Sequence, residues 1–118
     1  MIELEDVIAN FENASFVNTK VTKHATEFRS RVNGRFIYVD CDSLWNNRIH
    51  LVIDEGLITD RSWIPMGVNL GDRYHNSNMR QFDTRLHRGK NPIHYGVSIV
   101  ASSFTSMSDF LKAFNALK

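Results

Sequence analysis

Arginines and aromatic residues alternate along two neighbouring segments of the chain. Arg29 and Arg31 precede an Asn-Gly pair, and Phe36 and Tyr38 follow it. Asn-Gly favours a two-residue hairpin turn, which would place Arg31 opposite Phe36 and Arg29 opposite Tyr38, all on one face. On an exposed sheet face, aromatic rings stack on nucleic-acid bases and arginines hold phosphates. The alternative is that both rings lie under a helix, with the arginines extending past its edge.

Residues 77–88 form a second candidate surface. Met79, Phe82 and Leu86 recur at a spacing that predicts a helix with one apolar stripe. The other side of this helix carries the arginines Arg80, Arg85 and Arg88. Such a side can lie along a phosphate backbone or an acidic protein surface, or it can be the solvated side of an ordinary surface helix.

Carboxylates and histidines are further candidates for chemistry. Asp40 and Asp42 stand two residues apart at the expected end of a strand, where paired carboxylates can share a divalent cation, although such aspartates more often cap turns. Histidines can supply the acid and base for metal-independent RNA cleavage, but no spacing selects a pair. The five histidines are His24, His50, His75, His87 and His94. No GxSxG, phosphate-binding loop, dinucleotide fingerprint or HExxH motif is present, so we expect no cofactor and no metal.

Hydrophobic spacing predicts the elements that position these residues. Helices are expected at the two ends of the chain and over the second basic stretch, at 2–13, 77–88 and 107–117. Alternating segments predict strands at 21–32, 35–41, 48–54 and 93–102. Along the hairpin, alternation assigns Phe28, Ser30, Val32, Ile37, Val39 and Cys41 to a core face. The stretch 55–71 gives no regular pattern, because a Pro and a Gly interrupt it.

This order predicts an α+β fold. We expect a single domain over 1–118, with an antiparallel sheet of hairpin-linked strands and amphipathic helices at both termini packed on one face. Its one cysteine excludes an intramolecular disulfide and a cysteine-based zinc site. No apolar run is long enough for a membrane helix and the N-terminus does not resemble a secretory signal, so we expect a cytoplasmic protein with no membrane contact.

The charge distribution indicates a binding protein. The net charge is only +1, but basic residues concentrate in 20–35 and 72–90 and acidic residues in 1–13 and 40–60. With no assembled catalytic motif, we expect a small non-catalytic module that engages nucleic acid, or a protein complex that handles nucleic acid, through its arginine-bearing surfaces. The alternatives are a metal-independent ribonuclease that uses histidines, and an inhibitor or immunity-type protein whose charged patches match a partner protein. The identity of the partner and the oligomeric state do not follow from the sequence.

Overall fold

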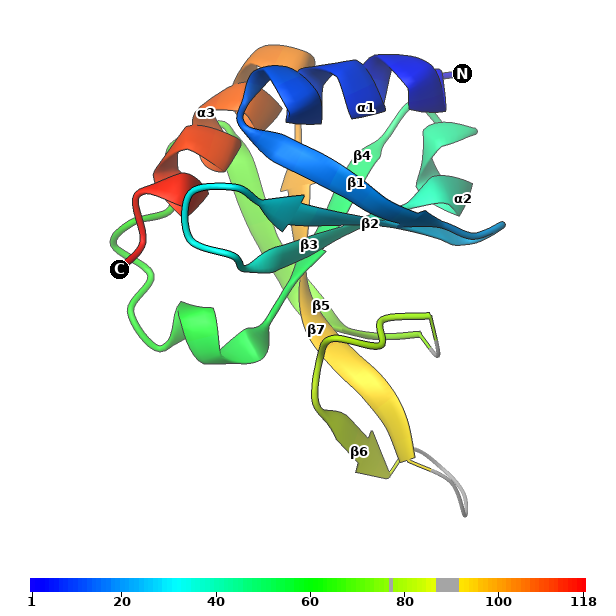
Figure 1. Ribbon diagram of the computed structural model, residues 1–118, viewed down its shortest axis with the longest axis vertical. Coiled ribbons are helices and arrows are strands. Elements are labelled where there is room, and N and C mark those ends of the chain that lie inside the picture. Colours follow the sequence, from blue (N-terminus) through cyan, green and yellow to red (C-terminus); the bar gives the residue numbers. More distant parts are fainter. Residues whose placement is uncertain (77, 87–91) are drawn as a thin grey trace.

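Segments with apolar residues at alternate positions pair into one antiparallel sheet (Figure 1). The computed structural model describes residues 1–76, 78–86 and 92–118. The strands are β1 Phe16–Val21, β2 Ala25–Ser30, β3 Phe36–Asp40, β4 Ile49–Ile53, β5 Val68–His75, β6 Thr84–Leu86 and β7 Pro92–Ala101. Their order across the sheet is β1-β2-β3-β4-β7-β5, and β6 pairs with the first residues of β7. The helices are α1 Leu4–Asn13, α2 Cys41–Leu44, the 3-10 turn η1 Glu55–Ile58, and α3 Phe104–Asn115.

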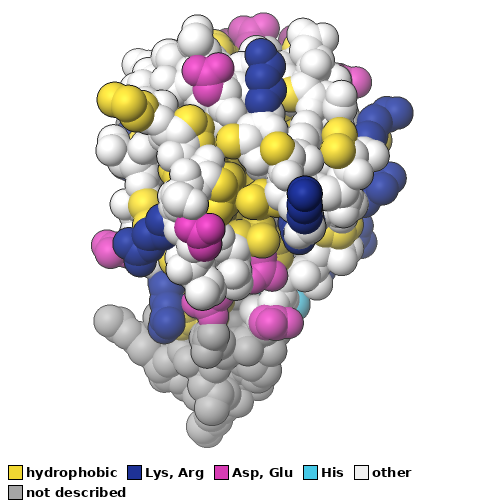
Figure 2. Space-filling view, turned by 90° about the vertical axis from the view of Figure 1, so that its left-hand side faces the viewer, with side chains coloured by type: hydrophobic (Ala, Val, Ile, Leu, Met, Phe, Trp, Pro, Cys, Tyr) yellow, Lys and Arg dark blue, Asp and Glu magenta, His cyan; other side chains and the backbone are white. Residues whose placement is uncertain are grey.

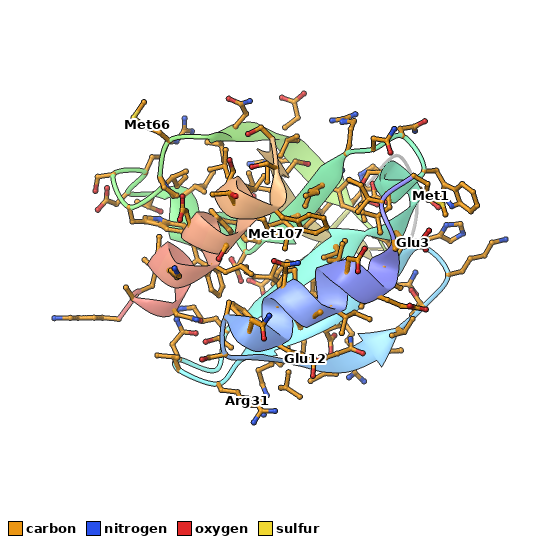
Figure 3. The ribbon with its side chains drawn as sticks, turned by 90° about the horizontal axis from the view of Figure 1, so that it is seen from above. Met1, Glu3, Glu12, Arg31, Met66 and Met107 are labelled. Atoms are coloured by element: carbon orange, nitrogen blue, oxygen red, sulfur yellow. The ribbon has the colours of Figure 1, made fainter. Side chains whose placement is uncertain are left out.

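Two amphipathic helices cover the same face of this sheet, as the α+β prediction requires. Val7 and Phe11 of α1, and Met107 of α3, are fully buried against the apolar side of the strands. Seen from above, α1 and α3 lie beside each other across the sheet (Figure 3). Burying these side chains stabilises the fold by roughly 1.5–3 kcal/mol each. None of the helices described for this chain is long and apolar enough to cross a membrane.

The faces of the paired hairpin residues were predicted correctly, but the predicted register was wrong by two residues. Arg29 pairs with Phe36 and Glu27 with Tyr38, so residues 31–34 form the connection instead of a two-residue turn. Asn33 lies in this connection, and its side-chain amide donates to the carbonyl of Phe114 at the end of α3. Because the shift is an even number, the paired residues of β2 and β3 stay on their predicted faces. The core-face prediction is wrong for Val32, which lies in the connection and is 62% exposed, and for Cys41, which begins helix α2 and is only partly buried.

The helix predicted for 77–88 is wrong over the described residues. Residues 78–82 form turns, in which Met79 N–H donates to Asn76 O and Phe82 N–H donates to Met79 O. Residues Thr84–Leu86 then form β6. Met79 and Phe82 are buried, as their spacing suggested, but turns of this kind also place residues i and i+3 on one side.

Other boundaries also differ from prediction. The predicted strand 21–32 resolves into the end of β1, a turn and β2, and β5 falls in and beyond the stretch that gave no pattern. Helix α3 begins at Phe104 because Ser103 caps it: its hydroxyl accepts from Ser106 N–H at 3.1 Å. Trp63 fills the remaining side of the core by packing against the ring of Phe110, with centroids 5.4 Å apart.

Gly96 gives a test of how tightly β7 packs. A Cβ at this position would collide with Val52 Cγ1 and lie 2.8 Å from the carbonyl oxygen of Ile53. We expect Gly96→Ala to lower the free energy of unfolding by about 1–3 kcal/mol, the usual cost of overpacking. Gly56→Ala is the matched control, because its nearest new contact is the movable carboxylate of Asp54 at 3.3 Å. Urea denaturation of both variants measures the difference, and equal losses would contradict this account of the packing.

Candidate functional site

The face of the sheet turned away from α1 and α3 carries the candidate functional residues. Glu27 and Arg29 of β2 share this face with Phe36, Tyr38 and Asp40 of β3, because cross-strand partners point the same way. Their neighbours along each strand point into the helix-covered core. Residues 78–82 fold back over the middle of this second face and bury it, and Phe36 at one end stays partly exposed.

Tyr38 lies in the covered part. Its side chain is 1% exposed, and its ring meets Phe82 edge to face with centroids 5.0 Å apart. The hydroxyl donates to Glu27 Oε2 at 2.5 Å and accepts from Gln81 N–H at 3.1 Å. Burial and the neighbouring Glu27 carboxylate both raise the pKa of Tyr38 above its ordinary value. Tyr38 therefore holds residues 79–82 on the sheet and offers no ring surface to the exterior.

Glu27 is the charged centre of the covered part. Arg80 grips its carboxylate with two hydrogen bonds, from Nε to Oε2 at 3.1 Å and from Nη2 to Oε1 at 3.0 Å, and Thr19 donates to Oε1 at 2.8 Å. Burial alone would raise the pKa of Glu27, but the bonds from Arg80, Tyr38 and Thr19 outweigh it and the pKa falls below the ordinary value. One arginine of the second basic stretch thus reaches the hairpin, where a carboxylate neutralises it.

The open end of the hairpin carries the exposed arginines. Arg29 and Arg31 are exposed, and Figure 3 shows Arg31 pointing away from the body of the protein. Phe36, the cross-strand partner of Arg29, is partly exposed. Across the described ranges 1–76, 78–86 and 92–118, neither Arg29 nor Arg31 has an ion-pair partner. By contrast, Arg35 donates to the carbonyls of Leu117 and Lys118 at 3.1 and 2.7 Å, which ties the turn to the C-terminus.

A cavity of about 330 Å³ opens beside Phe36. Its walls come from the start of β3, from η1 and from the end of the turns that cover the sheet. The lining residues are Arg35, Phe36, Asp54, Gly56, Leu57, Gln81 and Phe82. Figure 2 shows hydrophobic side chains exposed near the middle of the view, with both basic and acidic side chains around them. A planar apolar group with polar edges fits such a lining.

The side chains of the other two predicted arginines lie outside the described part of the structure. Arg85 stands in β6 opposite Ile93, in the part of the structure that projects from the sheet (Figure 1). Arg88 and His87 lie outside the described residues. The described structure thus places Arg29, Phe36 and Tyr38 on one face of the hairpin, and it pairs Arg80 with Glu27 of that face.

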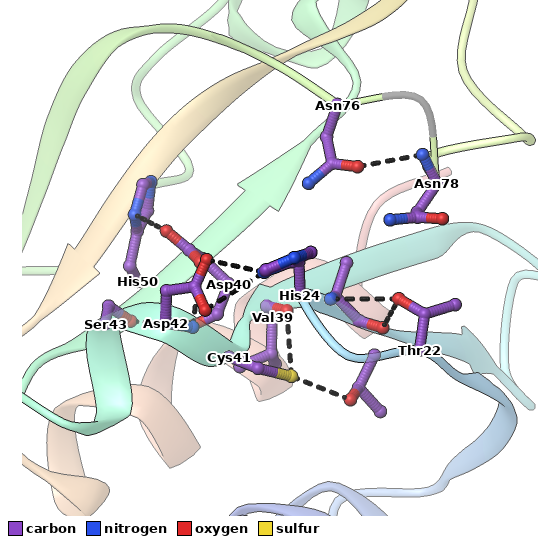
Figure 4. Close-up of polar contacts among 12 residues, drawn as sticks. Thr22, His24, Val39, Asp40, Cys41, Asp42, Ser43, His50, Asn76 and Asn78 are labelled. Atoms are coloured by element: carbon purple, nitrogen blue, oxygen red, sulfur yellow. Dashed lines mark hydrogen bonds and ion pairs between the residues drawn. The ribbon is translucent and has the colours of Figure 1, made fainter.

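Polar residues gather at the opposite end of β3, where the sequence indicated only paired aspartates (Figure 4). His24 Nδ1 lies 2.9 Å from Asp42, and His50 Nδ1 lies 3.1 Å from Asp40. His50 Nε2 also lies 2.7 Å from Ser98 Oγ. Each aspartate is thus hydrogen-bonded to a different histidine. No group of three metal-ligating side chains occurs among the residues that the structure describes. Alternation along β4 and β7 places His50 and Ser98 on the second face. The two side chains are in contact only because β4 and β7 are neighbours in the sheet.

The remaining described histidines are engaged elsewhere. His94 Nδ1 lies 2.5 Å from the carbonyl oxygen of Phe82, and the ring of His75 packs on Tyr95 with centroids 5.5 Å apart. His50 uses both ring nitrogens on protein groups. The described contacts therefore assemble no pair of histidines with free nitrogens facing a common point.

The depressed pKa of Glu27 predicts a specific pH dependence of stability. The pKa of Glu27 is lower in the folded protein than the ordinary value of 4.5. The ionised carboxylate therefore stabilises the fold above pH 4.5, and this stabilisation is lost as the pH falls through the lower pKa of the folded state. Glu27→Gln should cost about 1–3 kcal/mol at neutral pH and flatten the loss below pH 4.5. Glu12→Gln, at an exposed position of α1, is the control. Denaturation curves between neutral and acid pH measure both, and identical slopes for the two variants would contradict the role of Glu27.

Comparison with known proteins adds no relative from which a function could be transferred. No protein-family model, no curated protein and no solved structure matches this chain significantly. A function for this chain is therefore argued from its own side chains and their arrangement.

Proposed function

We propose that this protein is a binding module that engages single-stranded nucleic acid at the open end of the β2–β3 hairpin. The observation that carries the proposal is the pairing of exposed Arg29 with partly exposed Phe36 on adjacent strands, next to exposed Arg31. A base stacks on an aromatic ring while a guanidinium beside it meets the adjoining phosphate. Unpaired strands present both groups together, whereas a duplex hides its base faces.

The cavity beside Phe36 supports this proposal. A base that stacks on Phe36 at the surface has an apolar recess of about 330 Å³ next to it, with Phe82 and Leu57 in its walls. The side-chain amide of Gln81 stands at the same recess and is able to both donate and accept. These are the groups through which proteins hold unstacked bases.

The charged side chains at the open end of the hairpin favour nucleic-acid binding that weakens as the salt concentration rises. Arg80 is half-exposed, but Glu27 balances its charge, so Arg29 and Arg31 are the exposed positive side chains of the open end, beside Arg35 and Asp54 in the cavity wall. Two phosphate contacts on a single strand correspond to a slope of about −1.4 in a plot of log affinity against log salt. A footprint this small favours a short segment of a few nucleotides over a long tract.

We expect fluorescence anisotropy to detect binding of a labelled single-stranded oligonucleotide at about 50 mM salt, with affinity falling as salt rises. Phe36→Ala removes one stacking surface and should weaken binding by about 5- to 150-fold, since stacking contributes about 1–3 kcal/mol per base. The double variant Arg29→Glu, Arg31→Glu should weaken binding at least tenfold and reduce the salt slope by about 1.4.

Arg48→Glu is the matched control, because Arg48 is an exposed arginine between α2 and β4, away from the hairpin turn. It should reduce affinity far less than the double variant. An absence of binding to both RNA and DNA at low salt would overturn the proposal. Equal losses from Arg48→Glu and from the hairpin double variant would also overturn it, since the attraction would then lack a defined surface.

A further inference from the structure

Three side chains from adjacent strands form a continuous chain of hydrogen bonds on the second face of the sheet. Asp40 at the end of β3 lies 3.1 Å from His50 Nδ1, and His50 Nε2 lies 2.7 Å from Ser98 Oγ on β7. A carboxylate only accepts, so the ring hydrogen resides on Nδ1 and the Nε2 lone pair accepts the hydrogen of the Ser98 hydroxyl. This is the acid–base–nucleophile order that activates a serine.

The surroundings hold the imidazole in this orientation. The side chains of Asp40 and His50 are 12% and 14% exposed, and Ser98 is 8% exposed. These three hydrogen-bonded residues are therefore mostly, but not completely, shielded from water. Tyr74 of β5 packs edge to face on the ring of His50, with centroids 5.1 Å apart. The ring is thus fixed by a bond at each nitrogen and by an aromatic neighbour, which is the preorganisation that a general base needs.

The strand beside Ser98 is irregular where it passes the hydroxyl. The register between β5 and β7 shifts between Leu70 and Arg73, which leaves Gly71 and Asp72 outside the ladder next to Ser98. A Cβ on Gly71 would lie 3.1 Å from Ser98 Cβ, so glycine keeps this side of Ser98 open. Bulges of this type release backbone N–H groups from pairing, and such groups stabilise a developing oxyanion.

We propose that Ser98 is the nucleophile of an acyl-transfer site, with His50 as its general base and Asp40 as a positioning residue, and that the substrate is a small ester or thioester. The site lies at the opposite end of β3 from Phe36 and does not depend on the nucleic-acid proposal. The small exposed area at Ser98 admits a short acyl group better than a bulky one.

The reaction is a hydrolysis in two steps. Ser98 Oγ bonds to the acyl carbon while its hydrogen passes to His50 Nε2, and His50 then gives that proton to the departing alcohol or thiol as the bond to it breaks. A water molecule next attacks the acyl-serine, passing one proton to His50. That proton returns to Ser98 Oγ as the carboxylic acid leaves, so ester and water are converted to acid and alcohol.

The test is covalent labelling of the folded full-length chain with a small alkyl fluorophosphonate, in which Ser98 Oγ bonds to phosphorus and fluoride leaves. We expect one adduct by mass spectrometry and its location on Ser98 by peptide mapping, at a rate that depends on His50. His50→Gln should slow labelling by about 100-fold or more. Asp40→Asn should slow it and also change the pH profile of the rate, which a purely structural role would leave unaltered.

Ser102→Ala is the matched control, because the Ser102 hydroxyl is exposed and contacts Gly67 O and Ser106 instead of a histidine. It should label at the wild-type rate. Peptide mapping of the wild-type chain decides the matter even where a variant fails to fold. No adduct on Ser98, or a rate that His50→Gln leaves unchanged, would overturn the proposal, while the oligonucleotide binding described above would stand or fall separately.

Discussion

The second face of the sheet depends on the hydrogen bonds that the buried Glu27 carboxylate accepts. This carboxylate is 2% exposed, and it accepts hydrogen bonds from β1, from β3 and from the turns after β5, through Thr19, Tyr38 and Arg80. A buried carboxylate without these donors would be strongly unfavourable, so each donor is held in place by the same requirement. The carboxylate thereby joins the edge of the sheet to residues 78–82, which cover the middle of the face.

That cover separates two regions with different chemistry. At one end of β3, Phe36, Arg29 and a cavity face outward, and at the other end Asp40 and His50 lie in a shielded polar cluster. Polar groups buried in such clusters need partners, and no buried side-chain nitrogen or oxygen in the described part of the chain lacks one. The same sheet face therefore holds a partly exposed surface at one end of β3 and a shielded hydrogen-bond chain at the other.

Prediction succeeded where local pattern and packing agreed. Phe28, Ile37 and Val39 alternate with polar residues, and only one face of the hairpin is able to bury them, so even a two-residue register error left their predicted face correct. The prediction of a helix over 77–88 failed because the buried side chains of Met79 and Phe82 belong to residues in turns. Spacing of three residues reports a shared direction and not the hydrogen bonds that produce it.

The sequence by itself determined the fold class, the two terminal helices and the side of each hairpin strand that is buried, because these follow from the spacing of apolar residues along short segments. Only the tertiary structure decided which polar residues meet. Strand β7 inserts between β4 and β5, which places Ser98 beside His50, although 48 positions separate them in the chain. Strand order is chosen by the packing of the whole core, and no local pattern in one segment records it.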